Sequence, residues 1–137
     1  MSYGVSAALQ AAVFQHLVAD TGLDALVAGA IYDALPQGSL PPVYVTLGPE
    51  DAQARSDVTG QGAWHRFTVS VVTDSAGFFA AKEVAAAVSD ALDNAALMLS
   101  RGQLAALNFY RARAQREGTG AVRRIDLIFR ARVDDTA

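Results

Sequence analysis

The chain has 137 residues, enough for one ordinary domain and short for two. It contains no cysteine, which excludes disulfides, thiol catalysis, cysteine-bound zinc and iron–sulfur clusters. Hydrophobic residues make up 52%, which favours a packed core over a disordered chain. The longest apolar run, Ala25 to Tyr32, is far shorter than the roughly 20 residues that cross a bilayer. We expect no signal peptide, since the first residues lack a basic start.

The net charge of −3 is divided unevenly along the chain. Residues 1–100 carry three basic and ten acidic side chains, whereas residues 101–137 carry eight arginines and four acidic side chains. Such polarity can indicate contact with nucleic acid, but the negative overall charge and the single lysine argue against a free-standing nucleic-acid binder. Complementary electrostatic contact between subunits is the other interpretation.

In the first half, apolar positions recur at three- and four-residue steps from Ser2 to Asp20 and predict an amphipathic helix, with Ser2 or Ser6 as its cap. Leu23–Ala28 predicts a further short helical turn. Ala30–Asp33 predicts a brief strand, and the β-branched segment Val43–Leu47 a longer one. We expect the polar, glycine-containing segment Gly48–Gly62 to be a flexible loop.

The second half predicts a strand at Ala63–Thr73, an alanine-rich helix over about residues 76–99, and a hairpin of two strands, Leu104–Gln115 and Ala121–Val133. Residues 134–137 are expected to form a frayed tail. The order of elements predicts one α+β domain over residues 1–137. Its two main helices should pack on one face of a largely antiparallel, mixed β-sheet.

The period-two alternation also predicts which side chains face the core. Leu107, Phe109, Arg111 and Arg113 are expected on one face of their strand. The face packed on helix 76–99 should comprise Phe67, Val69, Val71, Leu107, Phe109, Ile125, Leu127 and Phe129, with Val84, Val88 and Leu92 opposite.

Motifs that carry chemistry are absent from the sequence. It has no P-loop, no dinucleotide-binding glycine pattern, no zinc-protease motif and no nucleophile elbow. His16 and His65 have no second ligand at a suitable spacing, so both are interpreted as core or interface histidines. Asp90 and Asp93 are interpreted as exposed helix residues. We therefore assign no catalytic residue, no cofactor and no metal site.

The candidate residues for interaction are charged or aromatic side chains on the strands and the expected loop. Trp64 is either covered by a loop or an exposed anchor for a partner. The arginines form either a solvated outer face or a surface that contacts a subunit or lines a lumen; in the second case we expect them to pair with acidic residues of adjacent subunits. The candidates for a subunit or tube interface are Arg111, Arg113, Arg124, Arg130, Arg132, Trp64, Glu50, Asp51 and Asp57.

Five segments together resemble a known family. They are Ala7–Phe14, Leu23–Asp33, Pro41–Gly48, the strand Trp64–Val71 and the closing strand around Ile125–Ala131. In this pattern the chain resembles, over about residues 5–133, the tail-completion or tail-terminator proteins of long-tailed phages and phage-like gene transfer agents.

The resemblance implies a structural virion protein without enzymatic activity or cofactor. Members of the family form a homo-oligomeric ring, typically a hexamer, that caps the tail tube and stops its polymerisation. The implied partners are the major tail tube protein and the connector (stopper) protein between head and neck; no membrane is involved. DNA would pass through the ring without sequence-specific binding. The implied location is the tail–neck junction of a particle assembled in the bacterial cytoplasm. Another head–tail connector ring, a stopper or adaptor, is the first alternative, and a small enzyme or ligand-binding α+β domain is the second.

Overall fold

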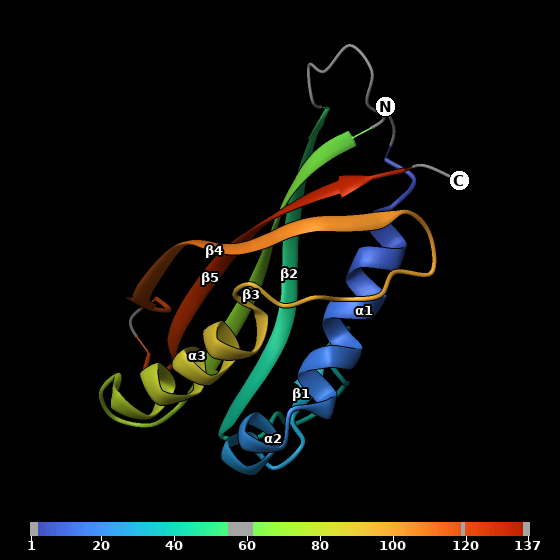
Figure 1. Ribbon diagram of the computed structural model, residues 1–137. Coiled ribbons are helices and arrows are strands. Elements are labelled where there is room, and N and C mark those ends of the chain that lie inside the picture. Colours follow the sequence, from blue (N-terminus) through green and yellow to red (C-terminus); the bar gives the residue numbers. More distant parts are fainter. Residues whose placement is uncertain (1–2, 55–61, 119, 136–137) are drawn as a thin grey trace.

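The computed structural model describes residues 3–54, 62–118 and 120–135. The chain forms, in order, α1 (Ser6–Ala19), α2 (Thr21–Val27), β1 (Ile31–Tyr32), β2 (Val43–Ala54), β3 (Gly62–Thr73), α3 (Phe79–Leu92), β4 (Gln103–Arg116) and β5 (Arg123–Asp134). The strands make one sheet in the order β1-β2-β3-β5-β4. Only β1 and β2 pair in parallel among the described strands; the other neighbours are antiparallel. The described helices gather on one face of the sheet (Figure 1), so the expected α+β class is confirmed.

Helices α1 and α2 are separated by Asp20, which acts as a cap. The Asp20 carboxylate accepts a hydrogen bond from the Leu23 N–H at 2.8 Å and so begins α2. Leu9, Val13 and Leu17 follow at four-residue steps on α1, and all three are buried against the sheet and α3. The expected serine cap of α1 is wrong for Ser6, because its hydroxyl bonds elsewhere and α1 has no side-chain cap. Ser2 lies outside the described residues.

Most of the expected loop Gly48–Gly62 is strand. β2 passes through a bulge between Leu47 and Glu50 and then pairs with β3 as far as Ala54. The composition of this segment suggested a loop, but continuous pairing with the long alternating strand β3 outweighs weak local propensity. Residues 55–61, the remainder of that loop, lie outside the described residues.

Helix α3 ends at Leu92, seven residues earlier than expected. Asp93 and Asn94 turn the chain toward β4, with Asn94 in the left-handed region at φ +62°. The Asn94 N–H donates to the Leu107 carbonyl, and the Asp93 carboxylate accepts from the Phe109 N–H, both at 2.8 Å. These bonds to β4 replace the next helical turn, which is why the apolar pattern beyond Leu92 did not continue as helix. No helix among the described residues is long and apolar enough to cross a membrane.

The last strand, β5, lies inside the sheet between β3 and β4 and ends one residue later than expected. Its side chains alternate between half-buried and buried from Arg124 to Asp134. Asp134, expected in a frayed tail, pairs with Gly62 of β3 and Gln103 of β4. Asp135 accepts two hydrogen bonds from the Arg101 guanidinium. The two neighbouring strands therefore hold this end of the chain, while residues 136 and 137 lie outside the described part.

The core lies between the sheet and the helices. Phe129 is completely buried, with its ring 5.7 Å from that of Phe67 and 5.9 Å from that of Phe109. The expected core residues are buried with one exception: Phe67, Val69, Val71, Leu107, Ile125, Leu127 and Phe129 on the sheet, and Val84, Val88 and Leu92 on α3. Phe109 is 42% exposed, so its assignment to the buried core is wrong.

Gly102 is expected to tolerate no side chain. Its φ is +72°, and a Cβ there would lie 2.6 Å from the Asp134 carbonyl oxygen and 2.8 Å from Val5. Gly102→Ala should lower the free energy of unfolding by about 2 kcal/mol or more, because backbone strain adds to a clash with backbone. Gly118→Ala is the control, since Gly118 also has positive φ but open space around it, and it should cost about 1 kcal/mol. Equal losses in urea unfolding would contradict the close packing at Gly102.

Candidate interaction surfaces

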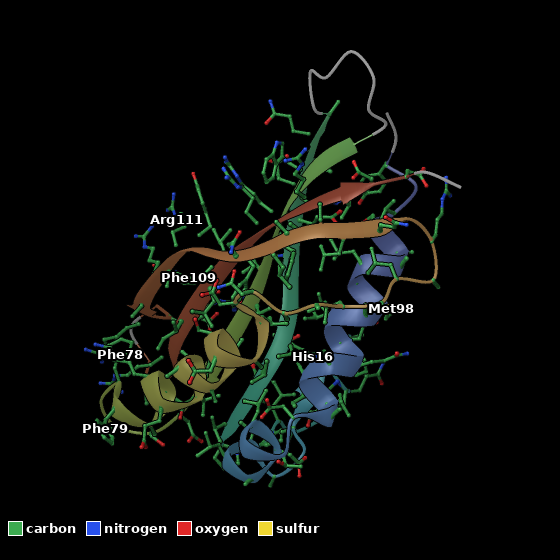
Figure 2. All side chains as sticks on the ribbon, viewed as in Figure 1. His16, Phe78, Phe79, Met98, Phe109 and Arg111 are labelled. Carbon is green, nitrogen blue, oxygen red and sulfur yellow. The ribbon has the colours of Figure 1, made fainter. Side chains whose placement is uncertain are left out.

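A bulge in β4 decides where its arginines lie. Phe109 pairs with Phe129, but Arg111 pairs with Ile128, so Tyr110 is an extra residue. Phe109 therefore points toward α3, while Arg111 and Arg113 lie on the opposite, helix-free face, as Figure 2 shows for Arg111. The expectation that Phe109 shares a face with these arginines is wrong, because an extra residue inverts the alternation. We call the helix-free side of the sheet the open face.

The open face carries all five candidate arginines, but Arg124 is engaged within the chain. Its guanidinium donates to Asp126 at 2.8 Å, to Ser70 at 3.2 Å and to Glu117 at 3.3 Å. The Ser70 hydroxyl, which is fully buried, in turn donates to Asp126 at 2.6 Å. This network holds β3 to β5 on the open face.

Arg130 and Arg132 lie beside the aromatic ring of Trp64. The Arg130 guanidinium is 4.3 Å from the Trp64 ring centre and 5.8 Å from that of Tyr110. The Tyr110 ring also contacts Arg66, whose guanidinium lies 4.5 Å from the ring centre. The Arg132 guanidinium lies 6.0 Å from the centre of the Trp64 ring. Trp64 is half-buried, and among the described residues the guanidinium groups of Arg130 and Arg132 lie against its ring. These cation–π contacts hold the side chains in fixed positions on the open face.

Glu50 bonds three side chains of its own chain. Its carboxylate accepts from Tyr3 at 2.5 Å, from Ser6 at 2.8 Å and from the fully buried His65 at 3.0 Å. Burial alone would raise the pKa of the Glu50 carboxyl, but the hydrogen bonds from Tyr3, His65 and Ser6 outweigh it and hold the pKa below its usual value. Glu50 thus joins the start of the chain to β2 and β3.

The other two acidic candidates differ from Glu50. Asp51 is exposed at the rim of a hollow on the open face whose lining includes Gln53, Trp64 and Arg66. Asp57 lies outside the described residues.

His16, expected in the core or an interface, is exposed on α1, where its Nε2 lies 2.8 Å from the Ala91 carbonyl at the end of α3 (Figure 2). Among the described residues, no three histidine, aspartate or glutamate side chains gather into a potential metal site.

Arg111 and Arg113 are exposed, and within the described part of the chain neither forms an ion pair. Arg113→Ala should therefore change the free energy of unfolding by less than about 0.5 kcal/mol. Arg124→Ala should cost about 1–3 kcal/mol, because it removes charge-assisted bonds and leaves the Asp126 carboxylate with the Ser70 hydroxyl but without its ion-pair partner. Chemical denaturation of the two variants checks this difference. An Arg113 variant as unstable as the Arg124 variant would show that Arg113 also stabilises the subunit.

A shallow groove between α3 and β4 was not anticipated from the sequence. The half-exposed Phe109 lies in it, and the described residues that line it are Lys82, Ala85, Ala86, Ser89, Phe109, Ala112, Ala114, Ile125 and Leu127. Alanines on both walls keep the groove open, because their side chains are too short to fill the space between helix and strand. The runs of alanine on α3 and the alternate alanines of β4 are the sequence signal that could have indicated it.

A five-stranded sheet with helices on one face is thus combined with exposed cationic and apolar surfaces. Residues 11–134 match the family described as "Tail completion protein gp17". The chain belongs to this tail completion family. The match confirms the resemblance drawn from the sequence, and with it the expected structural role in a phage-type tail.

One solved structure that this tail completion protein resembles is titled "Virion of native gene transfer agent (GTA) particle". The matched chain in that particle is 59% identical, with a TM-score of 0.92, and the similarity covers 97% of this chain and 99% of that one. The comparison with curated protein sequences gives no match.

Proposed function

We propose that this tail completion protein is a tail terminator: a ring of identical subunits that caps the tail tube and ends its polymerisation. The observation that carries the proposal is the family match over residues 11–134, since tail completion implies the last step of tail assembly. The similar chain in a gene transfer agent virion supports a structural role in a particle of that kind. The partners would be the tail tube protein on one side of the ring and the head–neck connector on the other.

The fold supports assembly through its surfaces. β1 and β4 are the two edge strands of the sheet, and the longer one, β4, has 14 residues and carries exposed arginines. Long edge strands are natural sites for contact with another chain. The groove beside β4 adds an apolar surface that such a contact can bury. These features favour a structural protein that assembles through its edges, and nothing in the proposal requires a reaction.

Particles assembled without this protein test the proposal. A terminator stops the tube, so its loss should give tails of irregular, excessive length that do not join heads. Loss of a stopper or adaptor ring would instead leave tails of normal length and affect the heads, which would lose their DNA. Electron microscopy of both fractions separates the two results, and supplying the wild-type chain should restore normal particles. Normal tail length in the absence of the protein would contradict the terminator role.

A further inference from the structure

The uneven charge of the sequence becomes a charge difference across the sheet. Residues 6–42, which form α1, α2, β1 and the segment leading to β2, carry three aspartates and no lysine or arginine. β4, at the opposite edge, carries three arginines and no acidic residue. We call the first the acidic edge (Asp20, Asp24, Asp33) and the second the basic edge (Arg111, Arg113, Arg116). Like charges at each edge disfavour contact between two equal edges.

The two edges also differ in apolar shape. Beside the acidic edge, Leu26, Leu35 and Leu40 are 44%, 47% and 38% exposed. Beside the basic edge lies the groove between α3 and β4, lined mainly by alanines, with Phe109 in it and Lys82 adding positive charge. One edge therefore presents exposed leucines with negative charge. The other presents an apolar groove with Lys82 on the helix side of β4, and Arg111 and Arg113 on the open-face side of the same strand.

We propose that the acidic edge of one copy of this protein docks against the basic edge of the next, with exposed leucines covering the α3–β4 groove. The partner is a second copy, because the complementary charges and apolar surfaces lie on one chain. A contact between two different patches of identical subunits continues from copy to copy, so it closes into a ring when the rotation per subunit allows. The apolar contact would supply most of the affinity, and the charges would select the orientation. This inference rests on the proposed ring.

Charge reversal tests the orientation. Arg111→Glu with Arg113→Glu, and separately Asp24→Arg with Asp33→Arg, should each reduce finished tails by about tenfold or more, since each puts like charges across the contact. The four substitutions in one chain should restore tails, because the reversed edges are again complementary. Failure of the combined chain, with circular dichroism showing normal folding, would overturn the proposal.

Glu83→Arg with Asp90→Arg is the matched control. Both residues are exposed on α3 and are absent from the lining of the groove, and the pair changes the net charge by the same amount as the aspartate pair. These substitutions should leave tail number unchanged. A loss equal to that of the edge variants would show that net charge, and not the proposed contact, is the cause.

Cysteine cross-linking tests the contact itself, and the chain has no native cysteine to interfere. Ala112→Cys is combined with Leu26→Cys, Leu35→Cys or Leu40→Cys, and assembled particles are treated with a flexible bismaleimide. At least one pair should give a ladder of covalent oligomers up to the ring size, whereas a single cysteine can yield no more than a dimer. A ring visible by electron microscopy without a ladder, or dimers from single-cysteine chains, would overturn this inference alone. The absence of any ring from wild-type particles would overturn the proposed function as well.

Discussion

Phe129→Ala is expected to lower the free energy of unfolding by about 3–5 kcal/mol, which is a large fraction of the roughly 5–15 kcal/mol that stabilises a typical domain. Phe129 is fully buried on β5, an interior strand of the sheet, and its ring contacts those of Phe67 and Phe109. Alanine would remove the ring from this cluster and leave a cavity that the paired strands on both sides cannot close. Urea unfolding followed by circular dichroism measures the loss.

Phe79→Ala is the control for that measurement. Phe79 is the same residue type but 77% exposed at the start of α3, where Figure 2 shows it pointing away from the sheet. Its replacement should change stability by no more than about 0.5 kcal/mol. A loss below about 1 kcal/mol for Phe129→Ala would mean that this ring does not lie in the centre of the core.

Glu50→Ala is expected to cost about 2–4 kcal/mol, because its carboxylate accepts hydrogen bonds from two buried donors, Ser6 and His65, as well as from the exposed Tyr3. Without it, the Nδ1–H of His65 loses its acceptor in a fully buried position, and the hydroxyls of Ser6 and Tyr3 lose theirs. The start of the chain would also be held less firmly on β2 and β3. Asp51→Ala, at an exposed neighbouring position, should change stability by less than about 0.5 kcal/mol.

The same carboxylate predicts a dependence on pH. The pKa of Glu50 is lowered in the folded chain, so the unfolded chain takes up its proton first as the pH falls. The stabilisation by Glu50 is therefore present above the usual glutamate pKa of 4.5 and is lost as the pH falls through the lower folded value. Glu50→Gln, which does not titrate, should lose less stability between about pH 6 and about pH 3 than the wild type does. Equal losses would contradict a lowered pKa for Glu50.

Expectations from the sequence were accurate where one face of an element is buried. The alternation of β3 and β5 and the four-residue steps of α1 placed Val69, Leu127 and Leu17 in the core, where the structure has them. A buried face requires apolar residues at the repeat of the helix or strand, so the sequence alone shows which side chains are buried. The sequence contains no catalytic motif, which agrees with the structural role that the family resemblance implies. The same apolar pattern carried that resemblance.

What the sequence determined by itself is therefore the class of the fold, the buried faces and the unequal charge of its two ends. The tertiary structure decided the rest, because long-range pairing overrides local preference: β3 draws residues 48–54 into a strand, and β4 ends α3 at Leu92. One extra residue, Tyr110, moved Arg111 and Arg113 to the open face and left Phe109 beside a groove. Only the strand order turned a charge difference along the chain into acidic and basic edges on opposite sides of one sheet. A bulge and a strand order depend on partners distant in sequence, and no local period records them.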